Sequence, residues 1–188
     1  MKPLLHGLTM FTQNITRILL ILFAIASFCG CKARRDVKIG ETAPEFSATA
    51  ITGEPCSLNH FKGKIVVLYF WQNSCCGDSL KLVEPFYTAN RHMQLAIIAI
   101  NAGDPKEVVT SYAKNNGLTF TMLADEHSSI FKQYQVFGFP TIFIIDKNGV
   151  IRKKILGNIQ VDQLQELLQR QFDIQKQAET SYEKNHPR

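Results

Sequence analysis

Two adjacent cysteines, Cys75 and Cys76, stand where a strongly apolar segment gives way to a helical pattern. Residues 65–71, just before them, are apolar or aromatic and rich in β-branched types, which predicts a strand buried on both faces of a sheet. Helical spacing begins near Ser79, so the thiols lie at a predicted strand-to-helix junction. Unpaired N–H groups and the helix dipole favour a thiolate over a thiol at such a place. The pair is therefore the first candidate for thiol chemistry.

A helix is predicted for residues 79–92, because apolar residues recur there at intervals of three and four positions. Pro85 lies inside it and predicts a kink, since proline removes one helical hydrogen bond. Two more buried strands are predicted, over residues 95–100 and 141–145. These strands and this helix are the elements expected to position the thiols.

The remaining elements are shorter strands, turns and further helices. They are an N-terminal hairpin over 43–58, helices over 105–116 and 128–134, an extended segment over 119–123, a turn at 146–149, a strand over 150–156 and an amphipathic helix over 161–172. The strand after the turn must be antiparallel to its neighbour, because a four-residue turn cannot make a parallel crossover. The alternation predicts the α/β class, with a mixed central sheet flanked by helices and an N-terminal β-hairpin.

The first thirty residues, 1–30, have the pattern of a bacterial signal peptide. Positive charge at Lys2 and Arg17 precedes an uncharged apolar run at 18–28, which is shorter than the ~20 residues that a spanning helix needs. The small residue before Cys31 makes this point resemble a lipobox, in which Cys31 is lipidated. An ordinary secretory signal or an uncleaved anchor is the alternative. All three versions place the domain in the bacterial cell envelope, facing the periplasm or the exterior.

The rest of the chain divides into a tether over 31–41, one domain over 42–174 and a polar tail over 175–188. Loss of Lys2 and Arg17 with the signal leaves only a mild positive charge, so no nucleic-acid partner is predicted. Besides the lipid site, the cysteines of this part are odd in number and two are neighbours. That pattern is not the disulfide framework of a small secreted domain.

Five stretches together resemble the thioredoxin fold, and within it the TlpA/ResA-like branch of extracytoplasmic thiol–disulfide proteins of the redoxin (AhpC-TSA) type. They are residues 40–46, residues 58–64, the pair Phe70-Trp71 with Cys75 four positions after the tryptophan, residues 136–141, and residues 143–149. The resemblance implies a thioredoxin-like fold for most of the chain after the signal.

The resemblance also implies roles for individual residues. Cys75 matches the nucleophile, and Pro140 matches the cis-proline of a loop that faces it. Phe139, Pro140 and Trp71 are then expected to bind substrate, with backbone beside the proline pairing like an added strand. The implied partners are protein or small-molecule thiols and disulfides, and a membrane reached through the lipid anchor. No cofactor and no metal site is predicted.

The site departs from the family pattern Trp-Cys-x-x-Cys, because the chain reads Cys-Cys-Gly-Asp. Ser74 stands at the position of the second tryptophan, and Asp78 stands where the second cysteine is usual. Cys76 is an extra cysteine directly after the first. No residue therefore matches the thiol that normally resolves the mixed disulfide.

Three ways of resolving the mixed disulfide remain open. Cys76 can bond to Cys75, although neighbouring cysteines rarely satisfy ordinary disulfide geometry. Cys56, in the predicted hairpin, can pair with either of them, or it is simply a buried small apolar residue. In the third, Cys75 is a single reactive thiol resolved by an external thiol, which suits a peroxidase-like or reductant-dependent reaction that passes through a sulfenic acid.

Charged and polar neighbours are candidates for tuning the thiols. Lys81 would lower a nearby thiol pKa, whereas Asp78 would raise it. A solvated helix face and a helix cap are their structural alternatives. Tyr69 and Glu84 would relay protons only if they face the thiols.

The predicted function is that of a membrane-tethered, extracytoplasmic thiol–disulfide oxidoreductase with Cys75 as nucleophile. The alternatives are a thiol-dependent peroxidase-like redoxin, and a non-catalytic or copper-handling thioredoxin-fold module. The Pro-x-x-x-Thr-x-x-Cys pattern with which peroxiredoxins bind peroxide is absent from the sequence. Adjacent thiols also lack the spacing that lets two sulfurs reach one copper ion.

Overall fold

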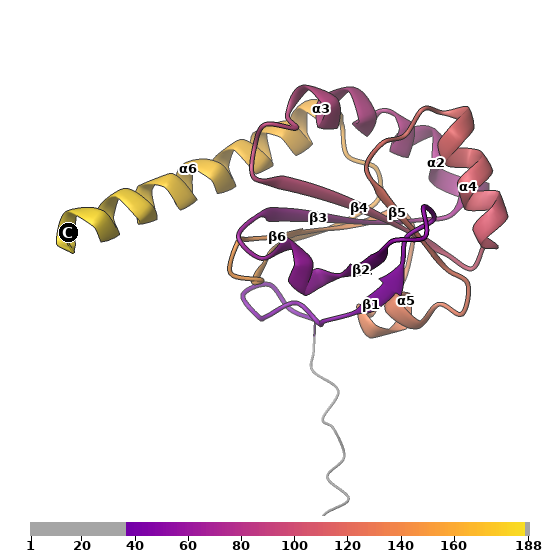
Figure 1. Ribbon diagram of the computed structural model, residues 1–188, viewed down its shortest axis with the longest axis horizontal. Helices are drawn as coiled ribbons and strands as arrows, with labels where there is room; N and C mark the ends of the chain where they lie inside the picture. The colour runs from indigo at the N-terminus through magenta and orange to yellow at the C-terminus, as the bar shows by residue number, and fades with distance from the viewer. Residues whose placement is uncertain (1–36, 187–188) are drawn as a thin grey trace, which may run out of the picture. The chain divides into compact units, whose positions relative to one another are not determined.

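The computed structural model describes residues 37–186, and Figure 1 shows a mixed sheet with helices packed against it. The strand order is β5-β4-β3-β6-β7; β3, β4 and β5 are parallel, and β6 is antiparallel to both β3 and β7. The strands are β3 (Ile65–Trp71), β4 (Leu95–Ala102), β5 (Thr121–Asp125), β6 (Thr141–Ile145) and β7 (Ile151–Leu156). The predicted mixed sheet and its antiparallel last pair are confirmed.

The central strands are buried from end to end, as their continuous apolar runs predict. Every residue of β3, β4 and β6 is buried. Successive side chains of a strand point to opposite faces, so the residues of β3 enter two separate core clusters. Phe70 belongs to one cluster and Trp71 to the other.

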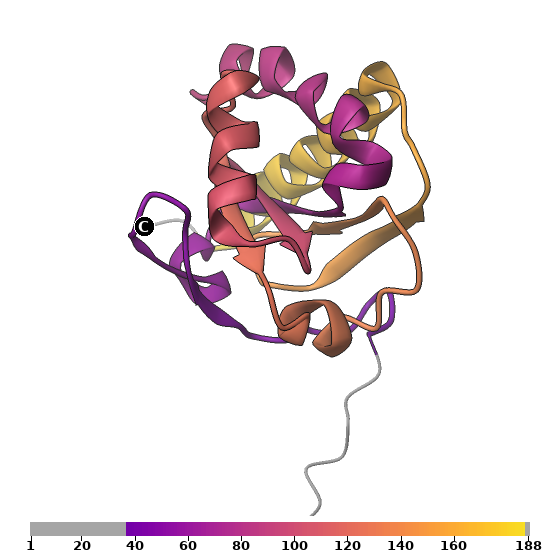
Figure 2. The same cartoon turned by 90° about the vertical axis from the view of Figure 1, so that its right-hand side faces the viewer.

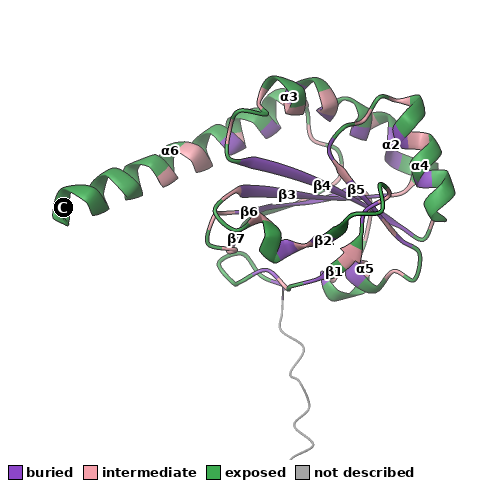
Figure 3. Cartoon of the chain, viewed as in Figure 1, coloured by how far each residue is buried: buried purple, intermediate pink, exposed green. Residues whose placement is uncertain are grey.

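Different elements cover the two faces of the sheet (Figure 2). One face carries the helices α2 (Asn73–Lys81), α3 (Val83–Ala89), α4 (Lys106–Asn115) and α6 (Val161–Asn185). The other carries the hairpin β1 (Ser47–Thr49) and β2 (Pro55–Ser57), the 3-10 helix η1 (Leu58–Phe61) and α5 (Ser129–Gln133). Figure 3 shows the buried strands between these two layers. The predicted N-terminal hairpin is confirmed.

The helix predicted for residues 79–92 is in fact two shorter helices. α2 begins at Asn73, so both cysteines lie within it rather than ahead of it. Its backbone leaves helical geometry at Cys76 (φ −144°, ψ 16°), and α3 starts again after Leu82. Pro85 lies in the first turn of α3, where a missing N–H loses no helical partner. It therefore does not kink a continuous helix.

α6 continues to Asn185, so residues 175–185, predicted as a polar tail, are helical. The stretch has no glycine or proline and is rich in Gln, Glu, Lys and Ala, which are good helix formers. The buried residues of α6, Leu164 and Leu168, lie in its first half. Figure 1 shows its last turns running past the sheet, and Glu179 there pairs with Lys147 of the turn between β6 and β7.

Candidate active site

The segments that carry the cysteines and the predicted cis-proline meet at one edge of the sheet. β3 and β4 run in the same direction, and Trp71 at the end of β3 pairs with Asn101 near the end of β4. β6 runs the opposite way, so its first residue, Thr141, pairs with Phe70. The segment after β3 and the segment before β6 therefore lie side by side.

The sulfur atoms of Cys75 and Cys76 lie 3.0 Å apart, although the two residues have different environments. Cys75 is exposed, whereas Cys76 is only 3% exposed. Both sulfurs also approach the carbonyl oxygen of Gln72, at 3.8 Å and 3.5 Å respectively. The site therefore presents one accessible thiol backed by one sequestered thiol.

Burial raises the pKa of Cys76 to about 12, and its hydrogen bond with Cys75 acts in the same direction. The N–H of Gln72 lies 3.4 Å from the Cys76 sulfur and acts in the opposite direction on that pKa. Cys76 is thus a protonated thiol at neutral pH. The N–H groups of Cys75 and Cys76 both donate to the Gln72 carbonyl, so they do not face the sulfurs as a simple helix N-terminus predicts.

A small polar cluster after β4 fixes the start of α2. Asp104 Oδ2 accepts hydrogen bonds from the Asn73 N–H at 3.2 Å and from Asn101 Nδ2 at 2.8 Å. Gln72 Nε2 donates to the carbonyl of Ala102 at 3.0 Å. From the sequence, residues 101–105 were assigned to the start of the helix that follows them. Their contact with the start of α2 was not predicted. The available signal was Asn101, a polar residue at the end of an otherwise apolar strand.

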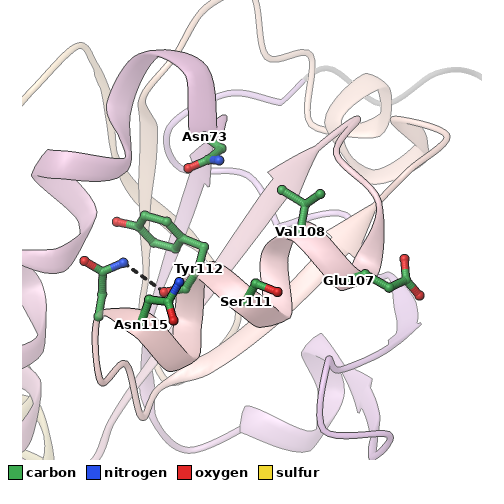
Figure 4. Close-up of a pocket in the computed structure, with 7 residues that line it drawn as sticks. Asn73, Glu107, Val108, Ser111, Tyr112 and Asn115 are labelled. Carbon is green, nitrogen blue, oxygen red and sulfur yellow. Dashed lines mark hydrogen bonds between the residues drawn. The ribbon is translucent and has the colours of Figure 1, made fainter.

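Tyr112 of α4 supports the other side of α2. Its hydroxyl donates to the carbonyl of Gly77, and its ring packs on Trp71 with centroids 4.7 Å apart. Burial raises the pKa of Tyr112 to about 12. A pocket of about 390 Å³ opens beside it (Figure 4), lined by Asn73, Glu107, Val108, Ser111, Tyr112, Asn115 and Asn116. Its lining contains neither cysteine, so the pocket borders the thiol site without being part of it.

The peptide bond between Phe139 and Pro140 is cis, as the resemblance implies. The loop is held on both sides, because the Gly157 N–H donates to the Pro140 carbonyl at 2.8 Å and Thr141 Oγ1 donates to the Gly138 carbonyl at 2.7 Å. The N–H and the carbonyl of Phe139 have no hydrogen-bond partner among the residues that the structure describes. A short piece of unpaired backbone thus lies at the edge of the sheet that carries the thiols.

The predicted substrate-binding residues differ in how far they are buried. Trp71 is fully buried against Tyr112, which contradicts the predicted contact with substrate and makes it a packing residue. Phe139 is half-buried, and its ring stacks on Phe131 at a centroid distance of 5.2 Å. Phe137, which sequence reasoning missed, is 88% exposed and stands two positions before it.

Cys56 lies in β2, on the opposite face of the sheet from Cys76. It is buried in the core cluster that contains Phe46 and Leu58, whereas Cys76 belongs to the cluster under α2. Burial, and then the Glu45 carboxylate, raise the pKa of Cys56 to about 11. The structure does not bring Cys56 to the other thiols. This contradicts its predicted resolving role and agrees with the alternative, a buried apolar residue.

Lys81 and Asp78, the predicted tuning residues, pair with each other instead. The Lys81 ammonium lies 2.7 Å from Asp78 Oδ1, and it holds the pKa of that exposed carboxyl below its ordinary value. Neither residue is among the groups that shift the pKa of Cys76. Their predicted role at Cys75 stays a prediction.

The two candidate proton relays do not bond to a thiol within the described part of the chain. Burial raises the pKa of Tyr69 to about 12. Ser79 acts to lower the pKa of Tyr69, whereas Cys76 and Cys75 act to raise it, so this hydroxyl lies near the thiols. Ser79 Oγ donates to the Cys76 carbonyl at 3.2 Å. Glu84 accepts a hydrogen bond from the Thr119 N–H at 2.8 Å and ties α3 to the segment before β5. Glu84 is therefore structural, whereas a relay role for Tyr69 stays a prediction.

Two further properties concern residues 37–186 alone. No cluster of three or more His, Cys, Asp and Glu side chains in this range could hold a metal ion. None of the helices there has the length and apolar character needed to cross a membrane. The predicted signal peptide and the lipid site at Cys31 lie outside the described residues.

Comparison with known proteins gives consistent matches. The profile of the AhpC/TSA family matches residues 39–154, more than half of the chain. Thiol-disulfide oxidoreductase ResA of Geobacillus kaustophilus is 31% identical over 160 residues, which cover 82% of this chain and 92% of the relative. Sporulation thiol-disulfide oxidoreductase A of Bacillus subtilis is 26% identical over 162 residues, covering 84% and 98%.

Solved structures share the arrangement of strands and helices. A putative protein disulfide isomerase from Bacteroides thetaiotaomicron superposes with a TM-score of 0.64 at 28% identity, over 71% of this chain and 87% of that one. StoA from Bacillus subtilis gives a TM-score of 0.59 at 29% identity, over 68% and 97%. The predicted thioredoxin-like fold is confirmed.

Proposed function

Because the chain belongs to the AhpC/TSA family and is a thiol–disulfide oxidoreductase, we propose that Cys75 is its nucleophile. The observation that carries this proposal is the position of one exposed thiol at the sheet edge where the cis-proline loop also lies. Cys76 is buried and protonated, and Cys56 is buried on the other face of the sheet. Of the thiols in residues 37–186, Cys75 is the one that solvent and substrate reach.

The proposed reaction starts when the Cys75 thiolate attacks one sulfur of a substrate disulfide. The Cys75–substrate bond forms as the substrate's own disulfide breaks, and the second substrate sulfur leaves as a thiolate that takes a proton from water. The mixed disulfide must then be resolved by a second thiol. The substrate class is protein or small-molecule disulfides.

Substrate is proposed to lie along the loop before β6. The unpaired N–H and carbonyl of Phe139 suit an extended segment that adds to the sheet edge. Phe137, which is almost fully exposed there, offers an apolar contact for residues flanking the substrate disulfide. Pro140 is buried, so its contribution is to the shape of the loop.

A tethered, extracytoplasmic location is the second part of the proposal. It rests on the apolar run at 18–28 and on the lipobox-like position of Cys31. In this arrangement the segment 31–41 joins a lipid anchor in the bacterial cell envelope to the domain.

The test of the nucleophile compares Cys75→Ser with Cys56→Ala, measuring catalysed reduction of insulin disulfides with a dithiol as the electron source. We expect Cys75→Ser to lower the catalysed rate at least about tenfold, equivalent to ~1.4 kcal/mol in activation free energy, because residues 37–186 contain no other accessible thiol. Cys56→Ala should retain most of the rate, since Cys56 lies on the other face of the sheet.

Full activity in Cys75→Ser would rule out this nucleophile. Peroxide consumption with a monothiol, in place of disulfide reduction, would instead support the peroxidase-like alternative. Absence of both activities in the folded wild-type protein would support a non-catalytic or copper-handling module, which a copper titration separates.

A further inference from the structure

We propose that Cys76 is the resolving thiol of this site and that it acts by forming a disulfide with its neighbour Cys75. This inference rests on the proposed function, because it needs Cys75 to carry the substrate as a mixed disulfide. The site then completes a two-electron cycle without the second cysteine of a Cys-x-x-Cys motif, whose place is taken by Asp78.

The geometry of the sulfurs is the first support. Neighbouring side chains of a regular helix do not face each other. Here the backbone departs from helical geometry at Cys76 (φ −144°), and the two sulfurs lie 3.0 Å apart. A disulfide bond requires about 2.05 Å, so a further approach of about 1 Å forms the bond. The local break in α2 thus has a chemical consequence.

The division of exposure between the two thiols is the second support. Substrate reaches Cys75, which is exposed, whereas Cys76 is too buried to meet a substrate disulfide directly. Cys76 is nonetheless in contact with the sulfur that carries the substrate. That separation of roles, one thiol for attack and one for release, is what a dithiol cycle requires.

The Gln72 backbone is the third support. Its N–H lies 3.4 Å from the Cys76 sulfur and would stabilise a thiolate there as it forms, while its carbonyl lies 3.5 Å away and can hold the thiol proton beforehand. Burial and the raised pKa of Cys76 keep this thiol protonated at neutral pH. Resolution is therefore expected to be slow at neutral pH and to accelerate as pH rises.

The step balances in atoms and electrons. The Cys76 thiol loses its proton to solvent, its sulfur attacks the Cys75 sulfur, and the substrate thiolate leaves and is protonated. Together with the first step, one substrate disulfide becomes two thiols and the protein dithiol becomes a Cys75–Cys76 disulfide. An external dithiol then returns the protein to its reduced form and is itself oxidised to a disulfide.

The disulfide so formed would be unusually easy to reduce. Consecutive Cα atoms across a trans peptide are about 3.8 Å apart, which is below the 4.4–6.8 Å usual for disulfides. Such a deviation strains the bond and makes it more reducible. An external dithiol is therefore expected to return the pair readily to the dithiol form.

The experiment measures the stoichiometry of the reaction with 5,5′-dithiobis(2-nitrobenzoate). The full chain is purified with Cys29→Ala, Cys31→Ala and Cys56→Ala in every sample, so that Cys75 and Cys76 are its remaining thiols. It is then reduced, freed of reductant and mixed with one equivalent of this disulfide. If Cys76 resolves, two equivalents of nitrothiobenzoate are released, and the peptide spanning residues 65–81 loses two hydrogens by mass. The second release should speed up between pH 7 and pH 9.

Cys76→Ala is the decisive variant, with Cys76→Ser as a second version in case the first fails to fold. Each should release one equivalent quickly and keep a stable adduct on Cys75. A stable adduct on Cys75 in the parent as well would overturn the inference while leaving the proposed function intact. By contrast, a Cys75→Ala variant that reacts as fast as the parent would overturn the proposed function itself.

Discussion

At the scale of single residues, two neighbouring cysteines acquire different chemistry from their surroundings. Cys75 faces solvent, whereas Cys76, also in α2, is buried in the core cluster between that helix and the sheet. One departure from helical backbone geometry, at Cys76, separates the two environments while keeping the sulfurs in contact. Cys75 is thereby the accessible thiol, and Cys76 is the thiol that holds its proton more strongly.

Cys56 gives a prediction about alkaline stability. Its pKa is raised from 9.0 to about 11, so between these values the unfolded chain loses the Cys56 proton while the native protein keeps it. The contribution is fully present below pH 9 and is lost as pH rises toward 11, because the unfolded state binds fewer protons there. Urea denaturation at pH 8 and pH 10.5 should show a smaller alkaline loss of stability in Cys56→Ala than in wild type. An equal loss in both proteins would contradict the buried-thiol assignment.

Some of the site could be predicted residue by residue, and some could not. The cis bond before Pro140 and the choice of Cys75 as nucleophile came from the resemblance to the thioredoxin-like family; the cis bond is confirmed, and Cys75 is exposed. The part of Gln72 could not be foreseen, since its backbone atoms contact the sulfurs and any residue type supplies those atoms. The Lys81–Asp78 pairing could have been predicted, because oppositely charged residues three positions apart on a helix are neighbours.

At the scale of elements, α2 depends on its contact with α4. A Cβ atom added at Gly77 would lie 3.0 Å from Cε2 of Tyr112, closer than normal packing allows. The Tyr112 ring cannot easily move, because it packs on Trp71 and its hydroxyl bonds to the Gly77 carbonyl. Glycine is therefore required at this point by close packing rather than by its backbone angles.

Gly77→Ala should accordingly destabilise the protein. Alanine gains up to about 1 kcal/mol over glycine within a helix, but overpacking costs typically ~1–3 kcal/mol, so the expected net loss is about 1 kcal/mol. Chemical denaturation measures it. In a Tyr112→Ala background the clash is gone, and the same substitution should become neutral or stabilising. A loss of the same size in both backgrounds would show that the contact with Tyr112 is not the cause.

The sequence predicted the type of most elements, and its errors have physical causes. β3, β4 and β6 were evident because strands buried on both faces are continuously apolar. The start of α2 was missed because Asn73 and its neighbours are polar, and the Asn73 N–H is held by the side chain of Asp104, just after β4. The end of α6 was missed because polarity, which indicates exposure, was taken to indicate loss of helix.

At the scale of the whole molecule, the mixed sheet explains why distant segments form one site. A parallel β4 and an antiparallel β6 flank β3, so the end of one neighbour and the start of the other lie beside the end of β3. Sequence positions that are about seventy residues apart are thereby joined at one edge. On the opposite face of the sheet, Cys56 and the hairpin form part of the hydrophobic core.

The attachment of the whole molecule to a membrane is tested with the full chain. Cys31→Ala should abolish fatty-acid labelling and move the protein from the membrane fraction to the soluble extracytoplasmic fraction, because the acceptor thiol is lost. Cys29→Ala is the matched control and should change neither result. A Cys31→Ala protein that stays in the membrane fraction would point to an uncleaved anchor, and a soluble wild type would point to an ordinary secretory signal.

The direct adjacency of Cys75 and Cys76 separates electron transfer from conformational stability. A disulfide is thought to stabilise a fold largely by restricting the unfolded chain, and the restriction grows with the number of residues that the bond encloses. A bond between neighbours encloses none, so it adds almost no restriction. The pair could therefore be oxidised and reduced repeatedly while the folded state remains equally resistant to unfolding in both forms.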